Sequence, residues 1–330
     1  MCKKSKKFSS ILADQMELFL QKKRSGGVKA ITTQWLLSEF DNYALSIGLN
    51  TPVITREFLE TWQKSCQTNS QRTLYAKFSL WRELTIFMRL NGYDCFVPQL
   101  PKVPSSEFIP YIFTHAQIQS IFKKIDCQKM HYNNMKTALF AMPALLRLLY
   151  STGMRVTEAL SLKNENVHTK EGYIYLGKTK NGYDRLAPMC DSLKCVLEDY
   201  ISHRNDLHIH GVTDPDHLFF FKPNGDALNS YLVYREFQKI LRLCGIPYNG
   251  GNHGPRVHDL RHTFAVHSLE QMWRSGMDLY AALPILSACL GHCSLHATEG
   301  YVRLTIEMYP EITSAGSVNN AFIYSKIKKK

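Results

Sequence analysis

Six side chains that could act on a phosphodiester occur in four short segments of this sequence. The segments read STGMRVTEALSL at 151–162, LGKTKNGYDRLAP at 176–188, RVHDLRHTFA at 256–265 and LGHCSLHATEGYVRL at 290–304. In chain order they contain Arg155, Lys180, His258, Arg261, His292 and Tyr301. Attack on a phosphodiester by a protein hydroxyl needs a nucleophile, cations around the non-bridging oxygens and a proton donor for the departing oxygen. The six side chains supply all three, so such a site requires neither a metal nor another cofactor.

Each residue type in this set suits one part of the reaction. The two arginines carry forked, permanent charges that match phosphate oxygens. The two histidines can move or share protons, and the lysine can protonate a leaving alkoxide. A free tyrosine has a pKa of ~10 and is a poor nucleophile at neutral pH unless a base or nearby cations act on it. His258 and the two arginines could do this for Tyr301.

Together and in this order, the four segments resemble the signature boxes of the tyrosine recombinases, the family of phage lambda integrase and Cre recombinase. The resemblance is specific over 151–304, and elsewhere it extends only to the layout of a helical DNA-clamping domain followed by a linker. It implies that Tyr301 forms a covalent 3′-phosphotyrosyl link, that Lys180 protonates the departing 5′-oxygen and that His292 donates a hydrogen bond to the phosphate. It also implies site-specific recombination of double-stranded DNA by a homotetramer in the synaptic complex. Off DNA the protein would be a monomer or dimer, with accessory DNA-binding factors as further partners.

Two lysines compete for the role of proton donor. Lys180 immediately precedes Asn181-Gly182, a pair that favours a type I′ hairpin turn, and Lys178 lies two residues earlier. Residues 173–188 alternate in a strand-like way around this turn. The T-K-N-G context favours Lys180, which would project from the hairpin tip. Lys178 remains the alternative proton donor and a predicted DNA contact.

Further charged side chains lie beside these six. Glu158 follows Arg155 by three residues, so on a helix it could hold the guanidinium in place, although an ordinary surface ion pair is the alternative. His262 and His267 are interpreted as packing or surface residues, off the helix face assigned to the catalytic histidine and arginine.

The last signature segment also contains a possible set of zinc ligands. These are Cys289, His292, Cys293 and His296. We expect no metal, because the intervening Leu-Gly suits a helix junction and no second ligand pair has the spacing of a zinc finger.

The composition indicates a polyanionic partner. The net charge is +12, and residues 1–105 carry 15 Lys or Arg against 8 Asp or Glu, whereas 251–300 carry 3 against 4. A basic surface that only maintains solubility is the alternative. Nine scattered cysteines suit a reducing cytosol, and the basic start MCKKSKKFSS lacks the apolar region of a signal peptide. With no apolar stretch of the roughly 20 residues needed to span a bilayer, we expect a cytoplasmic, nucleoid-associated protein.

The N-terminal third predicts a helical DNA-binding domain. Residues 8–92 show four helical patterns, and the fourth has an apolar face formed by Leu74, Phe78, Trp81, Leu84 and Met88. The opposite face carries Arg72, Thr73, Lys77 and Arg82. A solvated charged face would explain these residues, whereas the resemblance implies DNA contacts by Arg72, Thr73 and Lys77. The proline-rich segment 98–110 separates the domains, so we expect a DNA clamp at 1–104 and a catalytic domain at 105–330.

The second domain is expected to be helical around one small sheet. Thr114 is a candidate N-cap for a helix through Ile125, a long helix is expected near 133–150, and the sequence is mostly helical from 191 onward. The predicted fold class is therefore mainly α with a small antiparallel β-sheet. It combines a SAM-like helical clamp domain with an α+β catalytic domain.

Two features near the C-terminus bear on the type of enzyme. The stretch between Gly276 and Leu290 is longer than the family pattern and is interrupted by Pro284, which favours a transposon-associated branch. The apolar stretch Ala321–Tyr324 could dock on a neighbouring subunit, whereas a type IB topoisomerase acts as a monomer. A non-cutting DNA-binding regulator has no physical need for all six groups. We therefore predict a tyrosine-type site-specific DNA recombinase acting in integration, excision or transposition, with type IB topoisomerase-like relaxation and non-cutting DNA binding as the alternatives.

Overall fold

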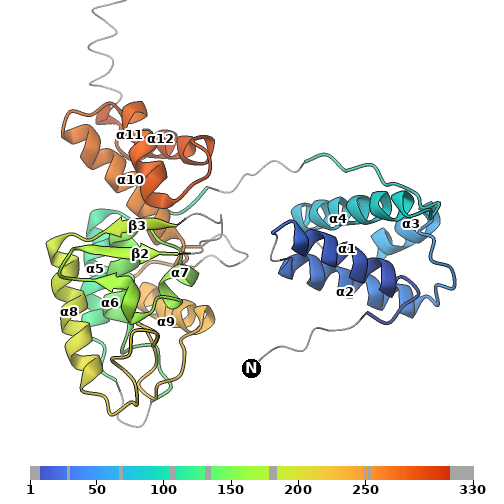
Figure 1. Ribbon diagram of the computed structural model, residues 1–330. Helices are drawn as coiled ribbons and strands as arrows, with labels where there is room; N and C mark the ends of the chain where they lie inside the picture. Colours follow the sequence, from blue (N-terminus) through green and yellow to red (C-terminus); the bar gives the residue numbers. More distant parts are fainter. Residues whose placement is uncertain are drawn as a thin grey trace, which may run out of the picture. The chain divides into compact units, whose positions relative to one another are not determined.

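The structure is a computed structural model that describes residues 8–27, 30–66, 70–103, 109–130, 135–177, 184–248, 250 and 254–312. The chain divides into two compact units, Met1–Phe108 and Ile109–Lys330 (Figure 1). The described parts are mostly helical with one three-stranded antiparallel sheet, which confirms the predicted fold class. The domain boundary expected after residue 104 falls on residues outside the described ranges. No helix in these ranges is long and apolar enough to cross a membrane.

The described residues of the N-terminal unit form four helices. They are α1 (Ala13–Ser25), α2 (Ile31–Ser46), α3 (Arg56–Ser65) and α4 (Gln71–Leu90). The Thr55 hydroxyl accepts a hydrogen bond from the Phe58 amide at 3.2 Å and so caps α3. The rings of Phe40 and Trp81 stack with centroids 3.9 Å apart in the core.

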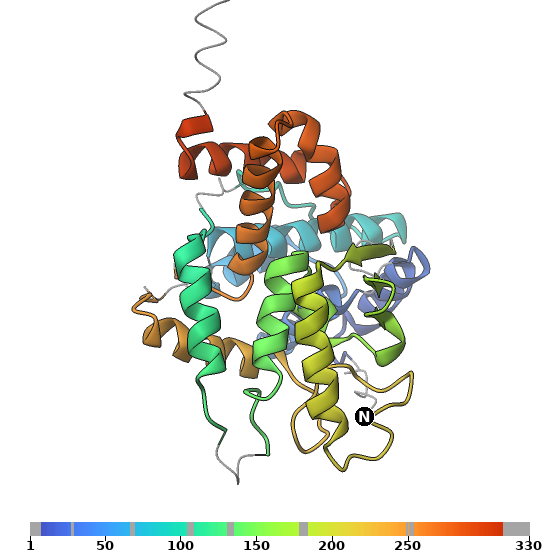
Figure 2. The same ribbon diagram turned by 90° about the vertical axis from the view of Figure 1, so that its left-hand side faces the viewer.

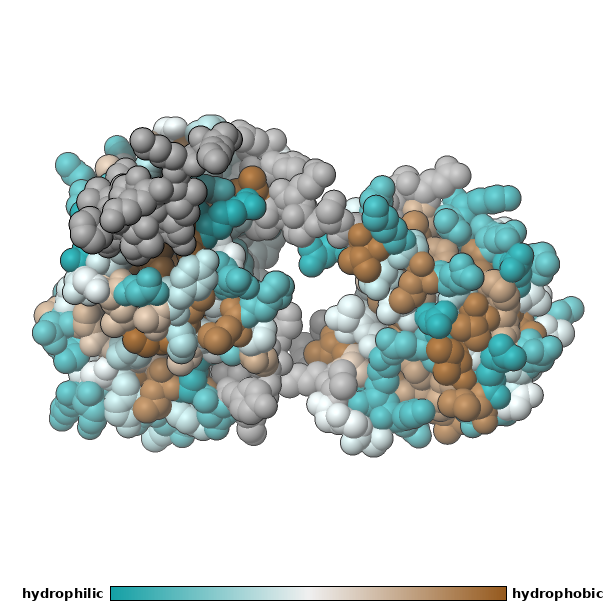
Figure 3. Space-filling model, turned by 90° about the horizontal axis from the view of Figure 1, so that it is seen from above, coloured by the Kyte–Doolittle hydropathy of each residue, from teal (hydrophilic) through white to brown (hydrophobic). Residues whose placement is uncertain are grey.

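Part of the apolar surface of this unit remains exposed. Figure 3 shows brown side chains gathered among polar ones on the face in view. Helix α2 carries the apolar residues Trp35, Leu36, Phe40 and Leu45, and of these four only Leu36 and Phe40 are buried. Trp35 is 63% exposed and Ile31, on the same helix, is 73% exposed.

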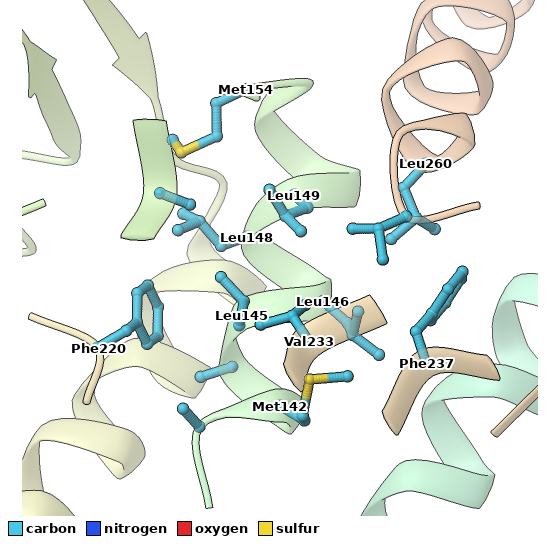
Figure 4. Close-up of a cluster of buried hydrophobic side chains, with 14 of the residues drawn as sticks. Met142, Leu145, Leu146, Leu148, Leu149, Met154, Phe220, Val233, Phe237 and Leu260 are labelled. Atoms are coloured by element: carbon cyan, nitrogen blue, oxygen red, sulfur yellow. The ribbon is translucent and has the colours of Figure 1, made fainter. Parts of the chain in front are cut away.

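The second unit has two layers of helices, and the lower one in Figure 1 is built around the buried helix α6 (Met142–Thr152). The helices of this layer are α5 (His115–Asp126), α6, α7 (Val156–Leu160), α8 (Asp191–Asn205) and α9 (Ser230–Leu243). Helix α6 lies between α5 and α8, and the three run side by side (Figures 1 and 2). Figure 4 shows leucines of α6 facing Phe220, Val233 and Phe237 from other segments.

A small sheet covers the edge of this layer. Its order is β1 (Val167–His168), β2 (Tyr173–Leu176) and β3 (Arg185–Pro188), with Ile174 paired to both Val167 and Ala187. The two longer strands are those predicted around the hairpin, while β1 was not predicted. The hairpin tip at 178–183 lies outside the described residues.

A second layer contains the last three described helices. They are α10 (Asp259–Arg274), α11 (Leu279–Leu290) and α12 (His296–Met308). The first turn of α10 places Leu260 in the core of the lower layer, whereas Ala265 and Leu269 pack with α11 and α12. Helix α10 therefore joins the two layers and fixes the third signature segment between the others.

Two predicted elements differ from the structure. The long helix expected near 133–150 begins only at Met142, and Pro143 lies in its first turn, where the missing N–H of proline costs no intrahelical bond. An interruption of the helix was expected at Pro284, but α11 continues through this residue. The carbonyl that loses its donor belongs to Tyr280 in the exposed first turn, where water can replace the bond.

Candidate active site

Arg261 lies where the ends of two helices meet. It is buried in the first turn of α10; its Nη1 donates to the Gly153 carbonyl at 2.7 Å and its Nη2 to the Leu290 carbonyl at 2.8 Å. Gly153 caps the C-terminus of α6, and Leu290 is the last residue of α11. Carbonyls at a helix C-terminus lack intrahelical donors and carry partial negative charge, so the guanidinium satisfies both. Arg261 thereby joins the first signature segment to the fourth.

Two glycines make this close approach possible. Gly153 has φ +60° and Gly291 has φ +65°, a left-handed conformation that other residues adopt at a cost. A Cβ on Gly153 would lie 2.3 Å from Phe264, and one on Gly291 would lie 3.0 Å from Arg185. The Thr-Gly and Leu-Gly pairs of the signature segments are therefore helix ends that need glycine for both conformation and space.

Glu158 holds two arginines, only one of which was predicted. It accepts hydrogen bonds from Arg155 Nη1 at 2.8 Å and from the Arg155 backbone amide at 2.9 Å, so the ion pair expected from the three-residue spacing is present. It also accepts from Nη2 of Arg185, the first residue of β3, at 2.9 Å. Burial alone would raise the pKa of Glu158, but the hydrogen bonds and charges of both arginines lower it to about 2.

Tyr301 lies on α12 and is only 7% exposed. Burial raises the pKa of its phenol, and the charges of Arg261 and Arg155 act in the opposite direction. The ring is nearly parallel to that of His292, with centroids 6.4 Å apart. Tyr301 is thus a protonated phenol beside a cationic cluster, an arrangement that favours attack once its proton can leave.

His292 connects the arginine cluster to α12. Its Nε2 lies 2.9 Å from Arg261 Nη2 and its Nδ1 lies 2.8 Å from the Thr298 hydroxyl. Because the guanidinium can only donate, Nε2 accepts and the ring proton is on Nδ1. Burial and then the charges of Arg261, Arg155 and Arg185 lower the pKa of His292 to about 4. A phosphate at this place would compete with His292 for the same guanidinium.

Two histidines around the start of α10, His258 and His262, differ from the expectation. His258 precedes the helix and its side chain is exposed, whereas His262, expected to lie outside the site, places Nδ1 2.8 Å from the Tyr301 hydroxyl. The interpretation of His262 as a packing or surface residue is therefore wrong. It follows His258 by four residues, a spacing that puts both rings on one helix face, with centroids 4.9 Å apart. His267 is buried, with Nδ1 2.9 Å from the Tyr150 hydroxyl, as a packing residue would be.

The remaining predicted residues lie apart from this cluster or outside the described ranges. Lys178 and Lys180 belong to the hairpin tip that is not described. Lys77 is not on an exposed face of α4, because its side chain is 4% exposed and its ammonium pairs with Glu39. Arg72 and Thr73, in the first turn of the same helix, are exposed. Among the described residues no His, Cys, Asp and Glu side chains gather so as to hold a metal ion.

The chain matches the model of the phage integrase family over residues 112–308, more than half of its length. It is 27% identical over 311 residues to y4rB of Sinorhizobium fredii, covering 92% of this chain and 96% of that one. It is 31% identical over 212 residues to the tyrosine recombinase XerC of Chlamydia caviae, covering 64% of this chain and 58% of that one. The chain therefore belongs to the phage integrase family. Within that family it is a site-specific DNA recombinase of the tyrosine type.

Solved structures share the fold. XerH recombinase bound to its difH substrate aligns with a TM-score of 0.63 at 20% identity, covering 90% of this chain and 84% of that one. The Tn1549 transposon integrase in complex with transposon end DNA aligns with a TM-score of 0.58 at 17% identity, covering 90% and 99%. A lambda integrase dimer bound to a core site aligns with a TM-score of 0.60 at 16% identity, covering 87% of this chain and 76% of that one.

Proposed function

We propose that this recombinase cuts DNA by attack of the Tyr301 hydroxyl on a phosphodiester, leaving a 3′-phosphotyrosyl link and a free 5′-hydroxyl. The observation that carries the proposal is the placement of the phenol beside Arg261, His292 and His262. Arg155 and Arg261 would bind the non-bridging oxygens, with Glu158 orienting Arg155. His258 would donate a hydrogen bond to the same phosphate. His292 would do so once the phosphate replaces it at Arg261 and its ring proton moves from Nδ1 to Nε2. The phosphotyrosine conserves the energy of the cleaved bond, so religation to a new partner strand needs neither ATP nor a metal.

A single substitution tests this proposal. Tyr301→Phe removes one oxygen, so DNA binding should persist while covalent attachment disappears. A nicked DNA site that traps the cleaved intermediate allows the adduct to be counted on a denaturing gel, in buffer containing a metal chelator. An adduct formed by the Phe variant would show that another residue is the nucleophile.

The leaving oxygen would receive its proton from Lys180. The strands that flank the hairpin support this role, since β3 is held in the site by Arg185, whose Nε also donates to the Cys289 carbonyl at 3.2 Å. A substrate with sulfur at the bridging 5′ position leaves without a proton, so it should restore cleavage to Lys180→Ala. Rescue of Lys178→Ala instead would assign the role to Lys178.

The N-terminal unit would bind the opposite side of the DNA as half of a clamp. Its charge excess of 15 basic against 8 acidic residues in 1–105 supports electrostatic binding to phosphates. Arg72 and Thr73 are the contacts we retain, because they are exposed at the start of α4. Lys77 is not retained, since Glu39 already neutralises it within the unit.

Recombination would take place in a homotetramer that brings two DNA sites together at the nucleoid, with accessory factors setting the direction of exchange. The C-terminal tail, which lies outside the described residues, would dock on a neighbouring protomer. Ending the chain at Ser317 should leave binding to one site nearly intact while abolishing the synapse. A truncated protein that recombines at the full-length rate would show that the tail is dispensable.

A further inference from the structure

We propose that His262 is a catalytic residue of strand cleavage, whose Nδ1 takes the hydroxyl proton of Tyr301 as the phenolic oxygen attacks the phosphorus. This inference rests on the proposed role of Tyr301 as the nucleophile. It assigns the base to His262 rather than to His258, the histidine that the sequence suggests for the task.

The geometry around the phenol points to His262. Its Nδ1 lies 2.8 Å from the Tyr301 hydroxyl, within the range in which a proton passes directly between two groups. The ring centroids are 5.8 Å apart with the planes at 44°, so the imidazole meets the phenol at its oxygen end. His258 contacts His262 edge to face and is exposed, which leaves it open to the DNA rather than to the phenol.

The charges around His262 keep its ring neutral until DNA arrives. Burial and then the neighbouring His258, Arg261, Arg256 and His292 lower its pKa to about 3. A neutral ring with its proton on Nε2 presents the Nδ1 lone pair to the phenol. A DNA phosphate bound by the arginines adds negative charge beside His262, which favours its protonated form. Proton transfer is thereby coupled to the presence of the substrate.

The proton balance of the step is complete. The Tyr301 Oη–P bond forms as the P–O5′ bond breaks, the phenolic proton moves to Nδ1, and the departing O5′ takes a proton from Lys180. In religation the O5′ attacks, its proton returns to Lys180, and the phenolate of Tyr301 recovers its proton from the His262 imidazolium. No metal, oxidant or further reactant enters either direction.

The two substitutions that test the proposal are His262→Asn and His262→Leu. Asn keeps a hydrogen-bonding atom near the position of Nδ1 but cannot be protonated in this pH range, whereas Leu keeps only the bulk. We expect single-turnover cleavage to fall by about 10²- to 10⁴-fold in both variants with DNA affinity unchanged. Cleavage by His262→Asn at the wild-type rate would overturn the proposal and leave His262 as a positioning residue.

His267 provides the matched control. It lies on the same helix, and its Nδ1 is likewise 2.9 Å from a tyrosine hydroxyl, that of Tyr150, which the proposed mechanism does not use. His267→Asn should therefore cleave at nearly the wild-type rate, even if its thermal stability falls. If His267→Asn loses as much activity as His262→Asn, the loss reflects damage to α10, and chemical rescue then decides the matter.

Two readouts separate a base from a structural role. Imidazole added to His262→Ala should restore cleavage in proportion to its free-base concentration, and failure to do so in a folded variant would contradict the proposal. The substrate with a bridging 5′ sulfur should rescue Lys180→Ala but not His262→Ala, since sulfur replaces the acid and not the base. Tyr301→Phe reports separately on the proposed function, because its adduct would disprove the nucleophile whatever His262 does.

Discussion

Cations in the two units of this protein are neutralised in different ways. In the N-terminal unit, Lys77 pairs with Glu39, Lys23 pairs with Glu83, and Arg82 Nη1 donates to a backbone carbonyl at 2.8 Å. In the candidate active site, Arg155 and Arg185 share the single carboxylate of Glu158.

Arg261 differs further, since the hydrogen bonds that it makes go to two carbonyls and to neutral His292. Cations that each have a carboxylate partner within the unit stabilise the fold. Where the arginines outnumber the carboxylates, the remaining positive charge favours binding of an anion from outside the protein. A count of basic residues therefore does not locate the phosphate-binding site, whereas the distribution of their partners does.

Substitution of Arg261 should produce the largest effect. Arg261→Lys keeps one charge but cannot reach both helix ends and a phosphate together, so cleavage should fall by about 10³-fold. Single-turnover cleavage of a nicked site measures this. Arg274→Ala, on the exposed end of the same helix, should change the rate little, because Arg274 already pairs with Glu270 and Glu311. Equal losses in both variants would remove the distinction between excess and neutralised cations.

Loss of the carboxylate shared by Arg155 and Arg185 should produce the second largest effect, a decrease in the free energy of unfolding. Glu158→Gln leaves Arg155 and Arg185 without a counter-charge, and the pKa difference between 4.5 and about 2 corresponds to on the order of 3 kcal/mol of unfolding free energy at neutral pH. Because the folded-state pKa is lowered, this contribution is complete above pH ~4.5 and disappears as the pH falls toward about 2. Urea unfolding of both proteins from pH 7 to pH 3 measures the difference. A gap that stays constant down to pH 3 would mean that the carboxylate charge is not its source.

Substitution of Arg185 should slow cleavage less, and the dependence of this defect on the substrate should identify the role of Arg185. Arg185→Leu removes the link between β3 and Glu158, so we expect about a 10-fold slower reaction from imprecise placement of the hairpin that carries Lys180. The defect should shrink on the substrate with a bridging 5′ sulfur, which needs no lysine. An undiminished defect would place Arg185 among the groups that act on the phosphate itself.

The smallest expected effect is a change in the salt dependence of DNA binding, which should differ between substitutions of Arg72 and Lys77 on α4. Arg72→Ala should weaken DNA binding and reduce the log–log salt slope by about 0.9, the value for one phosphate contact. Lys77→Met should leave that slope unchanged, because the ammonium of Lys77 is buried against Glu39. Titrations at four salt concentrations measure both slopes. A reduced slope for Lys77→Met would show that the pair opens to bind DNA.

Local signals in the sequence predicted the elements well where neighbours a few residues apart decide the outcome. Thr114 caps its helix as expected, and the pairing of 173–176 with 185–188 follows from alternation around a turn. The predictions for the start of α6 and for an interruption at Pro284 were wrong. Whether a helix tolerates a proline depends on whether the carbonyl that loses its hydrogen-bond donor finds another partner, and the local sequence does not show this. Strand β1, with two residues, is too short to leave a periodic pattern.

For the active site, the sequence by itself determined the class of protein and the side chains that such chemistry needs, because residue types and their order are a property of the chain. It also predicted the contact of Arg155 with Glu158, which depends on three residues of spacing. Only the tertiary structure decided that Arg185 joins Glu158 across 27 positions, that His262 meets Tyr301 across 39, and that Lys77 turns to Glu39 across 38. Partners so far apart are chosen by the packing of whole helices and strands, and the local pattern around each residue does not contain that information.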